Sequence, residues 1–308
     1  MVALALRASD AALELQGRTW RIVDLDELGD GAALEAELDA YAATAARSHL
    51  SAYGWYVPAW RAVRAGLAGR RDELHELQRR AAELGRLAGD GNADMVHTIH
   101  WVVAIADERP VWIDLEWQSA RIRTSPAGWA YRAMRTWALA SGDRRDDARR
   151  ELATMRAAGV PRSWPRDTNW LSAMKELSGV AVLLEDGELG AELAEMLTPF
   201  ADRTVVAARG LFAMGSVAGA LGRLADLAGD RRLAISRYEE AVERDERAGA
   251  TIWAIHHRRL LAEAVMAEGD EERGQALLRR VADEAPGAGL MHLAELARER
   301  LAADRAPR

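Results

Sequence analysis

The feature that most constrains this 308-residue chain is a turn signal that recurs seven times along it. In most copies a glycine ends one apolar-patterned segment, and an aspartate or another charged residue begins the next. Glycine suits the end of a helix, and a carboxylate suits the first turn of the helix that follows. The turns lie 34 to 45 residues apart, at Gly29, Gly69, Glu108, Gly142, Gly187, Gly229 and Gly269. We therefore expect a helical hairpin around each turn.

Each turn is followed by an apolar triplet at positions i, i+4 and i+7, which share one helix face. The clearest is Ala234, Tyr238 and Ala241, preceded by Leu221-Gly222, in the small/large/small order of a tetratricopeptide repeat. In the second unit we expect Leu77 to take the place of Gln78. The other sets are Leu34, Leu38 and Tyr41; Leu74 and Ala81; Ile113, Trp117 and Ala120; Ala148, Leu152 and Met155; Leu193, Leu197 and Phe200; and Gly274, Leu278 and Val281.

These patterns predict an all-α fold, a right-handed superhelix of about seven tetratricopeptide-like hairpins with a period near 40 residues. Ala, Leu, Arg and Glu dominate the composition, and 49% of the residues are hydrophobic, enough for a sizeable core. A single solenoid would span residues 1–308. A sub-boundary is possible at 157–170, where Pro161 and Pro165 prevent a continuous helix. The tail 302–308 is expected to fray.

Composition also excludes several classes of protein. The net charge is −7, with acidic and basic residues interspersed, so no basic stripe for direct nucleic-acid binding is expected. The chain has no cysteine, which excludes disulfides, thiolate metal sites and cysteine nucleophiles. The longest apolar stretch, around 205–221, is interrupted by Arg209, and residues 1–10 make a poor signal peptide. We expect a cytoplasmic protein that does not contact a membrane.

Four segments, 23–46, 53–73, 166–210 and 221–253, resemble the helical-repeat region of large actinobacterial signalling ATPases. That family includes MalT-like regulators of the LuxR type and relatives with an adenylate-cyclase domain. In it the repeat region is the sensor and interaction arm, and the resemblance covers about residues 18–269. A phosphate-binding G-x-x-x-x-G-K-[ST] loop is absent, since the single lysine, Lys175, follows Met174 in an apolar helical context. A recognisable helix-turn-helix is also absent. The resemblance implies a recognition role, in a stand-alone protein or a fragment of a longer one.

The segment "MVHTIHW" places His97 and His100 three residues apart, beside Trp101. The repeat register puts them in the first helix of the third hairpin, where His100 would pack in the core and His97 would be half-buried. Because the third turn lacks glycine, a shift of one residue would instead direct His97 and Trp101 to the inner surface. A two-histidine metal site needs a third ligand that the sequence does not supply. We expect no metal and no cofactor.

Tryptophan is unusually frequent, with eleven Trp against two Phe. Its large amphipathic ring is common in recognition surfaces. Several Trp lie on or just before the first helices of the hairpins, which line the concave side of such superhelices. We expect a binding groove lined by Trp55, Tyr56, His97, Trp101, Trp129, Trp170, Trp253 and His256.

Two functions remain open at this point. The first is a non-enzymatic recognition or sensor protein in signalling or transcriptional regulation, which binds a protein partner or small ligand in the Trp-lined groove. The absence of known catalytic motifs supports it. The alternative is a stand-alone enzyme or carrier acting on a small apolar or aromatic molecule in a closed cavity. Its acid/base candidates would be His97, His100, Asp114 and His256. A closed Trp-lined pocket that holds His97 or His256 would favour the alternative.

Overall fold

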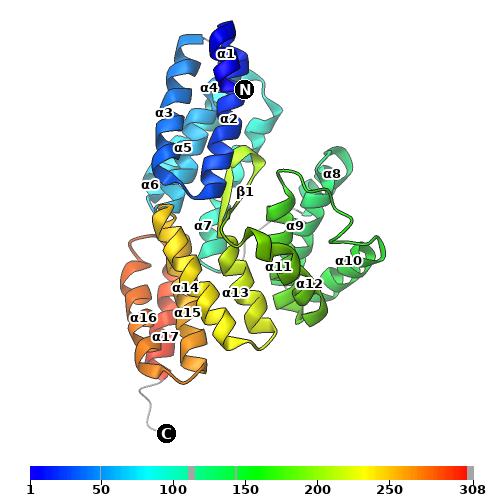
Figure 1. The fold of residues 1–308 in the computed structure, drawn as a ribbon, viewed down its shortest axis with the longest axis vertical. Coiled ribbons are helices and arrows are strands. Elements are labelled where there is room, and N and C mark those ends of the chain that lie inside the picture. Colours follow the sequence, from blue (N-terminus) through cyan, green and yellow to red (C-terminus); the bar gives the residue numbers. More distant parts are fainter. Residues whose placement is uncertain (49, 110–114, 143, 304–308) are drawn as a thin grey trace.

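The computed structural model describes residues 1–48, 50–109, 115–142 and 144–303, and it is predominantly helical (Figure 1). The N-terminal part consists of α1 Val2–Ala8, α2 Ala11–Leu28, α3 Gly31–Ser48, α4 Ser51–Gly54, α5 Tyr56–Leu67, α6 Arg71–Ala88, a 3₁₀ helix Gly91–Thr98 and α7 Trp101–Ala106. The middle part consists of α8 Leu115–Thr124, α9 Gly128–Ser141, α10 Arg145–Ala157, α11 Trp170–Leu184, α12 Gly187–Leu197 and a 3₁₀ turn Thr198–Phe200. The last part consists of β1 Thr204–Ala207, β2 Phe212–Ser216, α13 Val217–Leu227, α14 Arg231–Arg247, α15 Thr251–Ala267, α16 Glu271–Glu284 and α17 Met291–Ala303.

The predicted helical character is confirmed, and consecutive helices pack on each other across six of the seven predicted turns. The packed pairs are α2–α3, α5–α6, α9–α10, α11–α12, α13–α14 and α15–α16. The third turn differs, because α8 packs on α9 and 110–114 lie outside the described residues. The predicted third hairpin, which includes Ile113, is therefore not established.

The apolar triplets lie in the core of these hairpins. Ala234, Tyr238 and Ala241 are all buried, and a Cβ atom at Gly222 would lie 2.5 Å from the ring of Tyr238. The small residue thus allows α13 and α14 to approach closely. The expected replacement of Gln78 by Leu77 is wrong. Gln78 is buried itself, because its amide donates to the carbonyl of Val96 at 2.7 Å.

The turns also follow the predicted chemistry. Gly29, Gly69, Gly229 and Gly269 have positive φ angles, which glycine adopts without strain. In the fifth turn, however, Glu185 adopts the left-handed conformation and Gly187 begins α12. In four of these turns an aspartate accepts a hydrogen bond from the backbone N–H three residues ahead, at Asp30, Asp186, Asp230 and Asp270.

Replacing Asp230 by alanine is expected to lower the free energy of unfolding by about 1 kcal/mol, because the N–H of Leu233 loses its cap. Asp230→Asn keeps a side-chain acceptor and is the matched control. Urea unfolding followed by circular dichroism measures both variants. Equal losses for alanine and asparagine would contradict a capping role.

A short antiparallel β-hairpin, which was not predicted from the sequence, interrupts the otherwise helical chain. β1 pairs with β2 in the register Thr204 with Ser216 and Ala207 with Phe212. The two strands fall in and next to the apolar stretch around 205–221, for which the repeat pattern predicted no separate element. Adjacent β-branched residues, Val205 and Val206, favour a strand. In the connection between the strands, residues 208–211, Ala208, Arg209 and Gly210 are at positive φ.

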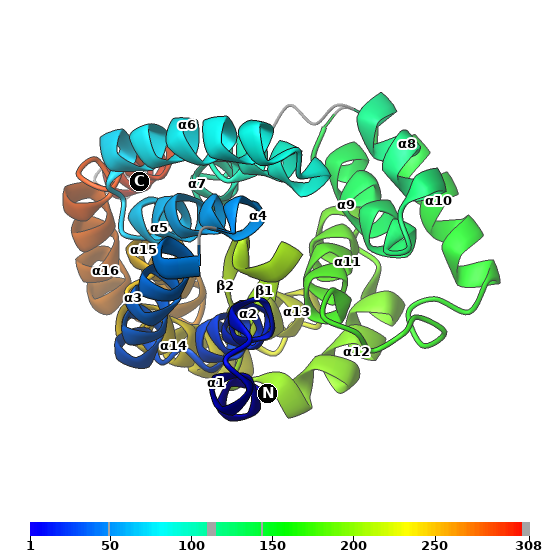
Figure 2. The same ribbon diagram turned by 90° about the horizontal axis from the view of Figure 1, so that it is seen from above.

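The β-hairpin lies at the centre of the molecule, with the helices arranged around it (Figure 2). It contacts helices from all three parts of the chain, namely α2, α5, α7, α11, α13, α14 and α15. The N-terminal part also contacts the C-terminal part directly. Arg64 donates to the carbonyl of Ala248 at 2.9 Å, and the N–H of Leu293 donates to Asp107 at 3.0 Å. Repeats of a simple solenoid contact only their neighbours. In this chain the N-terminal and C-terminal parts contact each other as well as the β-hairpin between them.

The possible sub-boundary at 157–170 corresponds to the connection between α10 and α11. Both α9 and α10 pack on α11, so helix packing continues across it. Helix α17 runs to Ala303, and the rest of the tail, 304–308, lies outside the described residues.

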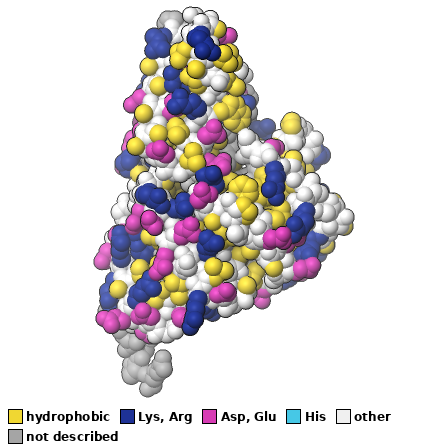
Figure 3. Space-filling model, viewed as in Figure 1, with side chains coloured by type: hydrophobic (Ala, Val, Ile, Leu, Met, Phe, Trp, Pro, Cys, Tyr) yellow, Lys and Arg dark blue, Asp and Glu magenta, His cyan; other side chains and the backbone are white. Residues whose placement is uncertain are grey.

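Acidic and basic side chains are interspersed over the face in Figure 3. In the described part of the chain, no helix has the length and hydropathy needed to cross a membrane.

Candidate functional site

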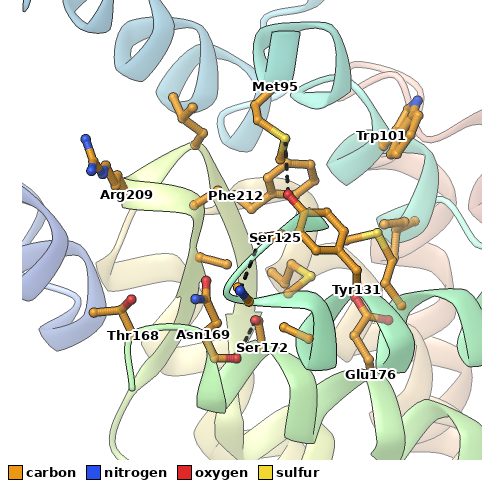
Figure 4. A pocket seen from close by; sticks show the side chains of 18 of the residues that line it. Met95, Trp101, Ser125, Tyr131, Thr168, Asn169, Ser172, Glu176, Arg209 and Phe212 are labelled. Atoms are coloured by element: carbon orange, nitrogen blue, oxygen red, sulfur yellow. Dashed lines mark hydrogen bonds between the residues drawn. The ribbon is translucent and has the colours of Figure 1, made fainter. Parts of the chain in front are cut away.

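A cavity of about 340 Å³ lies between the β-hairpin, α7, α9 and α11 (Figure 4). We call it the aromatic chamber because six aromatic and three methionine side chains line it. These wall residues are Trp20, Tyr56, Trp101, Tyr131, Trp137 and Phe212, with Met95, Met134 and Met214. Aromatic rings and methionines bind apolar molecules of varied shape well. Ligand sites have volumes of about 300–1,000 Å³, so the chamber could hold a small molecule.

A second cavity, of about 580 Å³, adjoins the first. The two share four lining residues, namely Ile105, Trp137, Glu176 and Met214. We call the second one the charged chamber, because ionisable side chains form much of its wall. These are Glu108, Arg109, Lys175, Glu176, Arg223, Asp226, His256, His257 and Arg259. The shared residues make the two chambers parts of one central cavity.

Arg209, in the β-hairpin connection, is fixed at the wall of the aromatic chamber. Its carbonyl accepts a hydrogen bond from the indole of Trp60 at 2.8 Å, and its guanidinium donates to the hydroxyl of Tyr56 at 3.2 Å. These contacts hold a non-glycine residue at φ 58°, a conformation that usually costs free energy. The hairpin is thereby joined to α5.

Lys175 and Glu176, adjacent on α11, project into the central cavity. Burial raises the pKa of Glu176 to about 7, and Lys175 offsets this only in part. Burial lowers the pKa of Lys175 to about 8, and the charge of Arg223 lowers it further. The ammonium of Lys175 lies 4.3 Å from the ring centroid of Trp253, a cation–π contact.

Two histidines of α15 form part of the charged chamber. Nδ1 of His256 lies 3.0 Å from the carbonyl oxygen of Ala106. Since a carbonyl only accepts, Nδ1 carries the proton and Nε2 is the acceptor. Burial lowers the pKa of His256 well below its ordinary value, so the ring is neutral at pH 7. Nδ1 of His257 lies 2.6 Å from the carboxylate of Asp245, which also accepts from the N–H of Ser216.

The structure brings four of the residues predicted from the sequence to the central cavity. Tyr56 and Trp101 line the aromatic chamber, and Trp253 and His256 line the charged chamber. Trp253 is nevertheless almost fully buried and donates to the carbonyl of Ala213 at 3.1 Å. The ring of Trp253 therefore packs in the core and also contacts Lys175.

Three predicted groove residues lie in the packing between helices instead. Trp55 is fully buried, stacks on Tyr56 at 3.9 Å between ring centroids and donates to Asp90 at 3.1 Å. Trp129 packs against Trp164, with ring centroids 5.1 Å apart. Trp170 is buried beneath Phe200 and Arg166. These large rings fill spaces between helices. The spacing of Trp along the sequence does not show whether a ring fills such a space or lines a groove.

The segment "MVHTIHW" does not form the expected helix. Residues Gly91–Thr98 form a 3₁₀ helix, in which positions i and i+3 eclipse each other. His100 lies in the turn that follows this helix. Both side chains reach the surface, with the ring of His100 partly shielded beside Gln78, which corrects their predicted burial, and neither lines the central cavity. Nδ1 of His100 lies 3.3 Å from the amide of Gln78. Partial burial lowers the pKa of His100, and His75 and His97 lower it further.

The fourth acid/base candidate, Asp114, lies outside the described residues. Across the ranges that the structure describes, no three His, Asp or Glu side chains are grouped closely enough to hold a metal ion. The cavity residues that sequence reasoning missed include Trp20, Trp137, Lys175, Glu176 and Arg223. A signal was present in α11, where Lys175 and Glu176 are the only charged residues in an otherwise apolar helix.

Comparison with models of known protein families gives no match to this chain, and comparison with curated proteins gives no significant match.

Proposed function

We propose that this chain is a helical-repeat recognition protein that binds a small, largely apolar or aromatic molecule in its central cavity. The observation that carries the proposal is the aromatic chamber itself, with six aromatic and three methionine side chains converging on about 340 Å³. Convergent apolar surface with a few polar groups is the usual composition of a small-molecule site.

A small ligand fits this architecture better than a peptide. Contacts between the N-terminal and C-terminal parts, such as Arg259 with Glu108 at 2.5 Å at the wall of the charged chamber, join the two ends of the chain where a long peptide groove would have to continue. The close packing at Gly222 and Tyr238 supports a tetratricopeptide-like origin of the hairpins. We therefore extend the sensor role implied by the family resemblance to a small-molecule signal, in signalling or transcriptional regulation.

An enzyme or carrier acting on such a molecule is the second candidate, and His256 favours it. The neutral ring has Nε2 as its remaining acceptor, and the side chain lines the charged chamber beside Trp137 and Trp253. A neutral imidazole in a ligand cavity can act as a general base. All of these candidates share the binding step, and only an enzyme would change its ligand, which mass spectrometry of the ligand after incubation would detect.

The proposal is tested with N-phenyl-1-naphthylamine, a neutral aromatic probe that fluoresces in apolar surroundings. Saturable binding to the wild-type chain is expected. Ala130→Phe places a ring in the aromatic chamber and should weaken binding at least tenfold, an estimate of about 1.4 kcal/mol. Ala138→Phe is the matched control, because Ala138 is half-buried on the same helix but does not line the chamber. Equal binding by both variants, or none by the wild type, would refute the proposal.

A further inference from the structure

We infer that the ligand carries an anionic oxygen group, such as a carboxylate, which Lys175 and Arg223 bind in the charged chamber while the aromatic chamber holds its apolar body. This inference rests on the proposed function and adds the chemical class of the ligand. It is carried by two cations that face one cavity and form no ion pair or hydrogen bond with a described carboxylate.

Most other charged side chains around the charged chamber are already paired. The pairs are Glu108 with Arg259 at 2.5 Å, Asp226 with Arg231 at 3.0 Å, Asp245 with His257 at 2.6 Å and Arg109 with Asp107 at 2.8 Å. Tyr238 also donates to Asp226 at 2.8 Å. These acidic groups are therefore already engaged and leave little capacity for a further cation.

Lys175 and Arg223 differ from these residues. Neither donates a hydrogen bond or forms an ion pair among 1–48, 50–109, 115–142 and 144–303. Both are half-buried and line the charged chamber, one from α11 and the other from α13, two helices that pack together. Partly desolvated like charges without acceptors cost free energy. A bound anion would offset that cost and satisfy both donors.

The ring of Trp253 orients one of the two cations. The ammonium of Lys175 lies over this ring, and the indole N–H of Trp253 is fixed by the carbonyl of Ala213. The contact gives Lys175 a defined position but leaves its N–H donors without acceptors among the described residues. Such a preorganised donor is what a carboxylate site requires.

One molecule can reach both chambers, because Trp137, Met214, Ile105 and Glu176 line the two together. An apolar body among Trp101, Tyr131 and Trp137 would place its anionic end toward Lys175. Glu176, at the junction, also accepts no hydrogen bond from a described residue. When protonated, its carboxyl group can donate to the anion, and when ionised it repels it.

Anion binding should therefore weaken as the pH rises from 6 to 9. Over this range Glu176, with a pKa of about 7, gains a negative charge, and Lys175, with a pKa of about 8, loses its positive charge. Both changes act in the same direction. The other titratable or charged groups that face the chamber are Glu108, Arg109, Arg223, Asp226, Tyr238, Asp245, His256, His257 and Arg259. All of these except Arg223 and the neutral His256 are held in the pairs described above.

The test compares two probes with the same aromatic body. 1-Anilinonaphthalene-8-sulfonate carries a sulfonate, which stays ionised throughout this pH range, and N-phenyl-1-naphthylamine lacks it. At pH 6 the sulfonate probe should bind at least tenfold more tightly, as expected for about one charge-assisted hydrogen bond. Lys175→Met and Arg223→Met should each remove most of this preference and leave binding of the neutral probe within about twofold. Arg232→Met is the matched control, because it removes the same charge from the exposed start of α14.

Circular dichroism identifies any variant that is unfolded, and the two variants test the inference independently. Equal affinity of the wild type for the two probes would overturn the inference while leaving the proposed function intact. A preference for the sulfonate that survives both substitutions would also overturn it. If neither probe binds saturably to the wild type, the proposed function fails, and the inference fails with it.

Discussion

Replacing Trp55 by alanine is expected to lower the free energy of unfolding by about 3–5 kcal/mol, the range measured for truncating large buried side chains. Trp55 is fully buried, stacks on Tyr56 and donates to Asp90. Alanine would leave a cavity between α5 and α6 and remove the donor to Asp90. Urea unfolding followed by far-ultraviolet circular dichroism measures the change.

Trp101→Ala provides the matched control, since both tryptophans were predicted to line a groove. Trp101 is only half-buried and faces the aromatic chamber. Its truncation should therefore cost much less stability and should weaken binding of N-phenyl-1-naphthylamine. A larger loss of stability for Trp101→Ala than for Trp55→Ala would contradict the placement of the two rings.

Glu176→Gln is expected to stabilise the protein at pH 8, and the gain should disappear toward pH 4. Burial raises the pKa of Glu176 from an ordinary 4.5 to about 7 in the folded protein. A raised pKa gives stability that is fully present below pH 4.5 and is lost as the pH rises to about 7. Glutamine mimics the protonated form at every pH. The gain is at most about 3 kcal/mol, because a tenfold change in a protonation equilibrium corresponds to about 1.4 kcal/mol.

Thermal unfolding of Glu176→Gln and the wild type at several pH values checks this expectation. The difference between the two proteins isolates the effect of Glu176 from that of other groups that titrate in a similar pH range. One of these is Asp26, whose pKa burial raises to about 6. Glu271→Gln, at an exposed position in the first turn of α16, is the control and should show no comparable gain. If Glu176→Gln stabilised the protein by the same amount at pH 4 and pH 8, burial would not raise the pKa of Glu176, and the prediction would be wrong.

The helical hairpins could be predicted because their causes are local. A triplet such as Ala234, Tyr238 and Ala241 records one buried face, and a pair such as Gly229 and Asp230 records a helix end and a cap. The β-hairpin could not be recognised in the same way. Its strands are short and buried on both faces, and their apolar run is consistent with a helix as well.

The closure of the chain was not predictable from the repeat pattern. It depends on contacts between residues more than 180 positions apart, such as Arg64 with Ala248 and Asp107 with Leu293. Periodicity reports which face of a helix is buried but does not identify the partner helix. For this reason the sequence predicted an open groove, whereas the structure has a cavity between the β-hairpin and the surrounding helices.

The candidate site was predictable only in part, for a related reason. Tryptophan side chains were identified as the relevant surface, and Trp101 and Trp253 do line the cavity. Trp55 and Trp170 have the same sequence context but fill spaces between helices. The sequence does not show that Lys175 and Arg223 face one cavity without forming an ion pair, because this depends on how α11 and α13 pack.

The position of the cavity also suggests how a ligand would affect the rest of the chain. The aromatic chamber is built from α7 and the β-hairpin together with α9 and α11, and these elements contact both ends of the molecule. A ligand that binds them would stabilise the closed arrangement by mass action. The temperature of unfolding should therefore rise with the concentration of a bound probe.

The most direct measurement is nuclear magnetic resonance of protein with ¹³C-labelled methionine methyl groups, titrated with N-phenyl-1-naphthylamine. The nine methionines include three in the aromatic chamber, Met95, Met134 and Met214, and two buried elsewhere, Met155 and Met266. We predict saturable shifts of the first three signals, with the other two unchanged. Shifts confined to Met155, Met266 or the exposed Met291, or no saturable shift at all, would contradict binding in the central cavity.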